Sequence, residues 1–496
     1  MQYMKRLKTD DFRQEDGVHA SFLSEFLLRP EISVSIVYAV FLLFAFISFK
    51  IATREFLLLP GGYFSNEPSF LAYMLSILGI TVLFFSVKIG RKSRFSNAPL
   101  VLASIFTAAS LALYLTFPLP LAIIFAVSGS YAFLLWFISK RLQDVNLLIS
   151  IALVIAFFSS FLMLLGGIPI LSAVSRQAAA IAPARALFHG FAVFSAVLLV
   201  AFYEKRKALA TIFLLALLAA ISGFKSDAIA ILVSASIVGL FLRRISAREL
   251  LLGLGCVVFL LTVVSTHIAG ISYGNWNIKP QLYIFYRAGL TFSVFDKIVQ
   301  LSFPFGYLHG EALLSTTQEI VSTAVLGYEK PHIITSTLLG SPMLDFGVLG
   351  ILLTCALLGA YLGTMHNCVS KTVSFRKKEW YLRDTMRTCL YAIALTHTFI
   401  LIEVGVQLTS ILFYLSLLYL ALARPPACAL PDGIALACEK PRPVVVSADP
   451  QKDKVFVFSR AILGYVCSSV VCYNIPSHPN FCKKIGEERH CWHRFT

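Results

Sequence analysis

Residues 286–299 read YRAGLTFSVFDKIV, and they lie in the stretch from about Ile271 to Phe346 that separates two strongly apolar segments. This stretch is the longest interruption in a chain that otherwise alternates between membrane-length apolar runs and short turns. It continues with PFGYLHGE at 304–311 and DFG at 345–347, and it holds many of the ionisable residues outside the basic loops. The side of a bilayer on which this stretch lies therefore decides the fold.

The composition is typical of a polytopic membrane protein. Hydrophobic residues make up 58% of the chain and charged residues 14%, with a mean hydropathy of +0.79, whereas a soluble domain carries about 25% charged residues. Apolar runs of about 18 to 20 residues recur, which match a hydrocarbon core of roughly 30 Å at 1.5 Å per helical residue. We predict an all-α polytopic transmembrane helical bundle of about twelve spans. The predicted spans are 32–49, 70–88, 98–116, 119–139, 146–165, 186–203, 208–223, 227–242, 249–268, 347–366, 387–405 and 407–423.

Lysines and arginines are distributed unevenly between alternate loops. One set of loops holds about 23 of them and the other about 9, and positive residues collect on the cytoplasmic side of a membrane. We therefore expect a multi-pass protein of the cell (plasma) membrane with both termini cytoplasmic and with 271–346 as a long extracytoplasmic loop carrying interfacial helices. The expected domains are a cytoplasmic N-terminal segment (1–31), a transmembrane domain (32–423) and a Cys- and Pro-rich, poorly ordered cytoplasmic tail (424–496).

The net charge of +16 does not indicate nucleic-acid binding. The positive residues lie in short loops and are not gathered on one face with interleaved aromatic residues. The tail contains zinc-type ligands at Cys482, His490, Cys491 and His493, but they lack a CxxC pair or a usual finger spacing. We expect neither a metal nor a cofactor.

Ionisable residues close to the predicted spans gather at the outer ends of those spans. They are Arg176, Arg185, His189, Lys225, Asp227, His267, Asp345 and Glu403. Only His397 falls in mid-helix, where a hydrogen-bonded packing role is expected. Transporters place their binding residues near the bilayer midplane, so this distribution favours chemistry at the outer face.

An outward-facing group of Arg, Lys, His and carboxylate side chains suits a lipid-linked anion whose tail stays in the bilayer. Arginine binds pyrophosphate well because its planar fork bonds two oxygens and keeps its charge, and helix N-termini add backbone donors. Arg287 precedes Leu290, Val294 and Ile298 at helical spacing, so we expect an interfacial helix that starts near Arg287. The alternative is that Arg176 and Arg287 only reach to lipid headgroups.

The turn between the seventh and eighth predicted spans reads SGFKSD at 222–227. A lysine and an aspartate at the mouth of two short spans need polar partners or water. The simpler alternative is that Lys225 and Asp227 form an ion pair with each other at the surface.

Five stretches occur in order on the predicted outer side. They are GGIP at 166–169 with Arg176, GFKSD at 223–227, YRAGLT at 286–291 continuing into VFDKI at 294–298, FGYLHG at 305–310 with Ser315, and TSTLLG at 335–340 with DFG at 345–347. Together they resemble the oligosaccharide repeat unit polymerases, membrane proteins related to O-antigen polymerases, over roughly residues 30 to 423. No single motif is diagnostic. Lys225 departs from the pattern, in which Arg is common after Gly-Phe, and the tail has no counterpart.

The resemblance implies a membrane glycosyltransferase that polymerises polyprenyl-pyrophosphate-linked oligosaccharide repeat units at the outer membrane face for surface polysaccharide. Donor and acceptor are both lipid-linked glycans, and neither a nucleotide sugar nor a metal is expected. A pyrophosphate leaving group needs positive charge where negative charge develops. Arg176, Arg287 and Lys225 are the residues that we expect to bind it.

The acceptor hydroxyl in such a reaction needs a general base. The candidates in the long stretch are His309, Glu311, Asp296 and Asp345, with His309 as base or acceptor ligand. Two other functions remain open at this point: an O-antigen ligase-like enzyme, which moves a finished chain to another acceptor, and a transporter of the same lipid-linked sugars. A lipid-scaffolding role is a third. The sequence does not give the oligomeric state.

Overall fold

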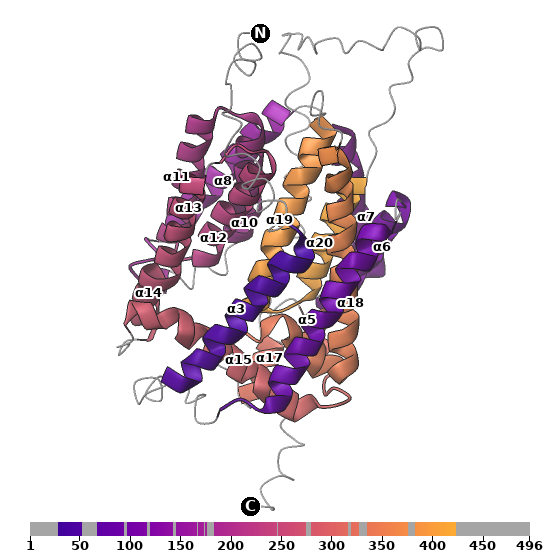
Figure 1. Ribbon diagram of the computed structural model, residues 1–496. Coiled ribbons are helices and arrows are strands. Elements are labelled where there is room, and N and C mark those ends of the chain that lie inside the picture. Colours follow the sequence, from indigo (N-terminus) through magenta and orange to yellow (C-terminus); the bar gives the residue numbers. More distant parts are fainter. Residues whose placement is uncertain are drawn as a thin grey trace, which may run out of the picture.

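The chain folds as a bundle of α-helices (Figure 1). The computed structural model describes residues 28–51, 67–93, 97–116, 120–141, 145–165, 167–172, 174–175, 183–245, 247–273, 279–315, 319–326, 335–374 and 382–422. Within these ranges the regular structure is entirely helical, without a strand. The all-α prediction is therefore confirmed for the described part of the chain.

The helices follow one another closely along the sequence. Their bounds are α3 (Pro30–Ile51), α5 (Phe70–Lys92), α6 (Ala98–Thr116), α7 (Leu121–Arg141), α8 (Val145–Leu165), α10 (Pro183–Phe202), α11 (Lys205–Ile221), α12 (Lys225–Phe241), α13 (Ala247–Phe259), the π-helical turn η1 (Leu260–Val264), α14 (Ser265–Tyr273), α15 (Pro280–Ser302), α16 (Glu311–Leu314), α17 (Glu319–Leu326), α18 (Thr337–Ser374), α19 (Leu382–Val404) and α20 (Leu408–Leu422).

Several of these helices have the length and composition of membrane spans. Within the described residues there are six, namely Pro30–Ile51, Phe70–Lys92, Val145–Leu165, Leu252–Ile271, Thr337–Val369 and Thr385–Val404. The chain is an integral membrane protein. Shorter apolar helices, such as Leu121–Phe137 and Leu187–Phe202, coincide with other predicted spans, so the total of about twelve stays a prediction.

The outward face of α8 is as apolar as a protein interior. Val154, Phe158, Phe161 and Leu165 recur every three or four residues and are 56, 60, 58 and 64% exposed. In a water-soluble protein such a stripe would turn toward the core. Here the same helix buries smaller side chains, including Ala152, Ala156, Ser159 and Ser160. This inversion fits a surface that lipid chains cover.

α5 and α18 approach each other closely through glycines. A Cβ added to Gly90 would overlap the carbonyl oxygen of Ala360, and one added to Gly359 or Gly363 would overlap the backbone of α5. Gly359 and Gly363 form a GxxxG pair, which lets transmembrane helices pack backbone to backbone. The two helices run in the same direction. Their contact fixes the position of α18, including the break in that helix that is described below.

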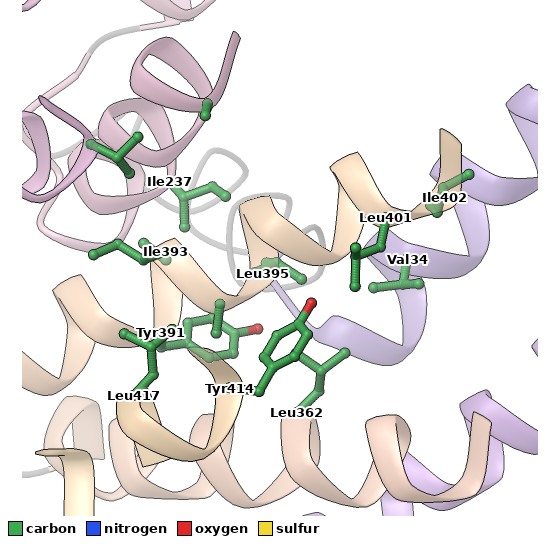
Figure 2. Packing of buried hydrophobic residues seen from close by; sticks show 14 of the residues in the cluster. Val34, Ile237, Leu362, Tyr391, Ile393, Leu395, Leu401, Ile402, Tyr414 and Leu417 are labelled. Atoms are coloured by element: carbon green, nitrogen blue, oxygen red, sulfur yellow. The ribbon is translucent and has the colours of Figure 1, made fainter. Parts of the chain in front are cut away.

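α19 occupies the centre of the bundle. Figure 2 shows side chains of α3, α12, α18 and α20, including Tyr414, packed against side chains of α19, including Tyr391. The hydroxyl of Tyr391 donates a hydrogen bond to the carbonyl oxygen of Leu28 over 2.8 Å, and the hydroxyls of Tyr414 and Thr398 lie 2.8 Å apart. The hydroxyls of Tyr391 and Tyr414 thus both have hydrogen-bond partners, which connect α19 to the segment before α3 and to α20.

The stretch predicted to be a long extracytoplasmic loop is largely helical. α15 packs against α3 and α18 and lies with α17 near the lower end of the bundle in Figure 1. Val294 and Ile298 are buried among protein side chains, so the expectation that this face lies on the bilayer is wrong. Arg287 lies in the third turn of α15, which begins at Pro280, and not at the start of a helix.

The predicted N-terminal segment falls almost entirely outside the described residues, as does the tail after residue 422. The zinc-type ligands of the tail lie there as well. The domain boundaries at 31 and 423 therefore stay predictions.

Candidate active site

Arg287 projects from α15 into a group of polar side chains contributed by other segments. Its Nε donates a hydrogen bond to Oε1 of Glu403 over 2.6 Å, and its Nη2 donates one to Oγ1 of Thr335 over 2.9 Å. The hydroxyl of Thr291, one turn after Arg287, lies 3.0 Å from that of Thr335. Arg287 is thus oriented by two partners, and its side chain keeps 27% of its surface exposed.

Lys225 reaches the same group from the start of α12. Its Nζ lies 3.2 Å from the hydroxyl of Tyr283, to which it donates a hydrogen bond, and 4.7 Å from the centre of that ring. Tyr283 lies one turn before Arg287 on α15. Lys225 also interacts electrostatically with Glu403. The structure therefore brings Lys225 and Arg287 together around one carboxylate.

Asp227 has partners on α10. Its Oδ1 lies 3.0 Å from Nδ1 of His189, and its Oδ2 lies 3.7 Å from Nε of Arg185. The guanidinium of Arg185 stacks 3.9 Å from the centre of the Phe224 ring. Asp227 is 3% exposed. The alternative of a surface ion pair between Lys225 and Asp227 is therefore wrong, because each has other partners and Asp227 is buried.

The local sequence explains how the turn before α12 forms. α11 ends in a Schellman motif, in which the N–H of Phe224 bonds to Ala219 and the N–H of Gly223 bonds to Ala220. Gly223 has a φ of +75°, which a glycine adopts without strain. The N–H of Ile170 donates to the carbonyl oxygen of Ile221, so the GGIP turn lies against this same helix end.

Three helices begin close to this group of charges. Arg185 is in the first turn of α10, Lys225 opens α12, and Thr335 lies two residues before the start of α18. A helix N-terminus carries a partial positive charge and unpaired backbone N–H groups. Arg185, Lys225 and Arg287 add three cations to two carboxylates, Asp227 and Glu403. We call these residues, with His189, the cationic cluster. It is suited to binding an anionic group.

The PFGYLHGE and DFG stretches form one backbone unit. α18 is broken at Gly347, which has φ and ψ of +60° and −140°. The N–H groups of Tyr307 and Leu308 bond to the carbonyl oxygen of Leu344, and that of Val348 bonds to Pro304. A Cβ at Gly347 would overlap the backbone of Pro304, and one at Gly306 would overlap that of Asp345. The glycines thus permit the close contact between the two stretches.

Asp345 lies inside this unit, whereas His309 and Glu311 lie on its surface. The carboxylate of Asp345 is fully buried and accepts hydrogen bonds from the N–H groups of Ala312 (3.0 Å) and Leu313 (2.7 Å). These bonds hold the start of α16. His309 and Glu311 are exposed. The three predicted catalytic residues are therefore neighbours. The carboxylate of Asp345, however, is already hydrogen-bonded to backbone N–H groups.

This unit is well separated from the cationic cluster. α15 carries Arg287 near one end and Ser302 at the other, about 22 Å apart at 1.5 Å per residue. The N–H of Gly306 bonds to the carbonyl oxygen of Ser302, which places the FGYLHG stretch at the far end of the helix. The structure thus divides the residues predicted from sequence into two groups.

Asp296, another base candidate, joins helices. Its carboxylate accepts hydrogen bonds from the N–H and hydroxyl of Ser69, the N-cap of α5, and from the side-chain amide of Gln300. It is 7% exposed. Within the described residues, no group of three or more His, Cys, Asp or Glu side chains is arranged to hold a metal ion.

The sequence was compared with known protein families. Residues 29–415, from just before α3 into α20, match the sequence model of the family described as "Putative O-antigen polymerase". The chain belongs to the O-antigen polymerase family. No curated protein and no solved structure matches it.

Membership fixes the broad function. An O-antigen polymerase joins oligosaccharide repeat units for surface polysaccharide, and its substrates are lipid-linked oligosaccharides in a membrane. Both residue groups described above lie within the matched residues. Arg176, a predicted pyrophosphate ligand of this polymerase, lies outside the described residues, so its role stays a prediction.

Sequence reasoning missed several residues that the polymerase brings to the cationic cluster. Arg185, His189 and Glu403 were noted as outer-end charges but were not assigned to the site. Tyr283 was not singled out, and Thr291 was quoted only as part of YRAGLT, although they lie four residues on either side of Arg287 and so share its face of α15. This spacing of four residues was the sequence signal that could have identified them. No pattern links Thr335 to Arg287 across 48 residues.

Proposed function

We propose that the cationic cluster binds the pyrophosphate of a polyprenyl-pyrophosphate-linked oligosaccharide donor on the extracytoplasmic face of the plasma membrane. The observation that carries this proposal is the position of Arg287, held by Glu403 and Thr335 beside Lys225 at the start of α12. A partly exposed, pre-oriented guanidinium close to helix N-termini is suited to a bidentate contact with phosphate oxygens. The polyprenyl tail extends along the apolar outer surface of the bundle.

The reaction is a glycosyl transfer. A hydroxyl of the acceptor glycan attacks the anomeric carbon of the donor sugar and gives up its proton to a base. The bond from that carbon to the pyrophosphate oxygen breaks, and polyprenyl pyrophosphate leaves with the bonding electrons. Negative charge grows on the leaving oxygen, so Arg287 and Lys225 stabilise the transition state more than the ground state.

His309 and Glu311 contact the acceptor glycan in this proposal. They are exposed at the far end of α15, where a chain of sugars extending from the cluster passes. Asp345 supports them indirectly, because it holds the backbone of α16. Arg176 adds a further cation to the pyrophosphate.

The direct test uses purified protein in nanodiscs with a synthetic polyprenyl-pyrophosphate oligosaccharide. Wild-type protein should produce a ladder of products that differ by one repeat unit. Arg287→Ala should reduce the rate on the order of 100-fold or more, as expected when one transition-state charge partner is lost. Arg287→Lys should recover only part of the activity, because an ammonium group does not form the bidentate contact.

The matched control is Lys207→Ala. Lys207 lies at the opposite end of α11 from the turn at 222–227, is 77% exposed and pairs only loosely with Glu204 at 3.3 Å. Its loss should leave the ladder unchanged. A single transfer without a ladder would indicate a ligase, and uptake into vesicles without a reaction would indicate a transporter.

Orientation is tested separately. A reporter fused near Gly310 should be active on the extracytoplasmic side, and a reporter at either terminus on the cytoplasmic side. A cytoplasmic signal near Gly310 would invert the topology and remove the donor from reach of the cluster.

A further inference from the structure

The proposed function gives no separate role to the pair formed by His189 and Asp227 in the cationic cluster. His189 lies in the second turn of α10, and Asp227 lies in the first turn of α12. Nδ1 of His189 and Oδ1 of Asp227 are 3.0 Å apart. A buried carboxylate that accepts the Nδ1 proton of a histidine fixes the tautomer in which Nε2 can accept a proton.

We infer that His189 is the general base that takes the proton of the acceptor hydroxyl, and that Asp227 is the positioning residue that orients it. This inference rests on the proposed function, because it assigns a step of that reaction. In the step, the acceptor O–H bond breaks and its proton passes to Nε2 of His189. The new bond from oxygen to the anomeric carbon forms as polyprenyl pyrophosphate leaves.

The exposure of the two residues supports this assignment. The side chain of His189 is 31% exposed, whereas that of Asp227 is 4% exposed. The imidazole is therefore accessible to a substrate, while its carboxylate partner is shielded from water. Asp227 is held by further contacts with Arg185 at 3.7 Å and with the hydroxyl of Ser226 at 3.3 Å. A base must have a fixed orientation, and these contacts supply it.

The position of His189 also fits the reaction. Arg185 lies one turn before it on the same face of α10, and Lys225 lies two residues before Asp227. The imidazole therefore belongs to the cluster that binds the leaving group in the proposed function. His309, the base candidate from sequence, lies instead beyond the far end of α15, which is itself about 22 Å from Arg287 along that helix. General-base catalysis requires hydrogen-bond reach.

In the described part of the chain, His189 interacts with Asp227 on α12 and with His397 on α19, and Arg185 on α10 shares the carboxylate of Asp227. α8 and α11 also pack on α10. α8 contributes no titratable side chain, and the charged residues of α11 are at 205–207, at the opposite end of that helix from the turn at 222–227. A change in activity with pH that is present in wild-type protein and absent from His189→Gln is therefore assigned to this imidazole.

The experiment measures polymerisation by purified protein in nanodiscs from pH 5 to 9, with the synthetic polyprenyl-pyrophosphate donor. Wild-type kcat/KM should rise with pH along a single acid limb. His189→Ala and His189→Gln should each reduce kcat on the order of 100-fold, the range found for lost general bases, with little change in donor KM. The acid limb should disappear, and added imidazole should restore part of the rate to His189→Ala.

Asp227→Asn tests the positioning role. It should lower kcat on the order of tenfold or more and leave donor binding unchanged. Imidazole should not restore it. His267→Ala, which removes an exposed histidine of α14, should leave rate and pH profile unchanged. Melting temperature and size-exclusion profile identify a variant that fails to fold.

The outcomes separate this inference from the proposed function. If wild-type protein forms no ladder, the proposed function fails. If the ladder forms and His189→Gln keeps the wild-type rate and acid limb, the proposed function stands and the inference is overturned. The inference is also overturned if His189→Ala loses donor binding along with turnover and imidazole has no effect, or if His309→Ala removes the acid limb instead.

Discussion

Nε of Arg287 donates a hydrogen bond to Oε1 of Glu403 over 2.6 Å, and this contact joins the third turn of α15 to the last turn of α19. α15 belongs to the stretch that hydropathy sets apart from the spans, whereas α19 is the central helix of the bundle. The contact therefore links the stretch that was predicted to be a loop to the central helix of the bundle. In the proposed function, the donor phosphate competes with Glu403 for the guanidinium of Arg287.

The strength of this pair is measurable. The side chains of Arg287 and Glu403 are 27 and 31% exposed, so solvent screens their attraction and the coupling should be about 1 kcal/mol. A double-mutant cycle with Arg287→Gln and Glu403→Gln, followed by unfolding in mild detergent, checks this value. The corresponding cycle for Lys205 and Glu249, a pair at 2.8 Å outside the cluster, is the control. A coupling energy near zero for Arg287 and Glu403 would mean that the contact does not orient the guanidinium.

Lys225 should tolerate arginine but not a neutral residue. Its charge lies 4.7 Å from the centre of the Tyr283 ring and close to Glu403, and arginine preserves both the charge and the ring contact. Lys225→Arg should keep the product ladder within a few-fold of wild type, whereas Lys225→Gln should shorten it and raise the donor KM.

Tyr283→Phe separates the two contacts of Lys225, because it keeps the ring and removes the hydroxyl that lies 3.2 Å from Nζ. It should have a smaller effect on donor KM than Lys225→Gln. Equal effects would show that the hydroxyl, and not the charge of Lys225, is what the donor needs.

The break in α18 should be intolerant of any side chain at Gly347. A Cβ there would overlap the backbone of Pro304, and the φ of +60° is strained for alanine. Gly347→Ala should lower the melting temperature and the yield of monodisperse protein. Gly255→Ala is the matched control, because no atom lies within 4 Å of an added Cβ in α13 and alanine favours a helix by about 1 kcal/mol. Equal melting temperatures for the two variants would contradict the importance of the contact between the two stretches.

The sequence was sufficient to predict the membrane class, the helical fold and the position of the six candidate spans, because those depend on apolar runs that are local in sequence. It was not sufficient for α15. That helix carries Arg287, Thr291 and Asp296, which lower its hydropathy. It was therefore predicted to be part of a loop. In the structure these side chains have partners on α5 and α19 and in the segment before α18. The pairing of polar residues across the bundle is a tertiary property without a local signal.

The candidate site was likewise predictable from the sequence only in part. Arg287 and Lys225 were predicted from residue type and outer placement, and the structure brings them together. The same reasoning grouped them with Asp345, because a carboxylate next to a span suggests a base. The partners of Asp345 are backbone N–H groups, and a sequence does not display which backbone groups need an acceptor.

The carboxylate of Asp345 is buried, whereas that of its neighbour Glu311 is exposed. Both carboxylate oxygens of Asp345 accept backbone hydrogen bonds at 3.0 and 2.7 Å, and asparagine supplies only one acceptor oxygen. Asp345→Asn should leave one buried N–H of α16 without a partner and reduce the free energy of unfolding by about 1–3 kcal/mol. In the proposed function Asp345 supports the fold of this region and transfers no proton, so the remaining activity should keep the wild-type pH profile. Glu311→Gln is the control: its side chain is exposed, so stability should change by less than about 0.5 kcal/mol. Thermal unfolding and a pH–rate profile of both variants decide the matter. The opposite result would be an Asp345→Asn protein that is as stable as wild type but has lost its pH dependence. That result would show that Asp345 is the base, as its position in the sequence suggests.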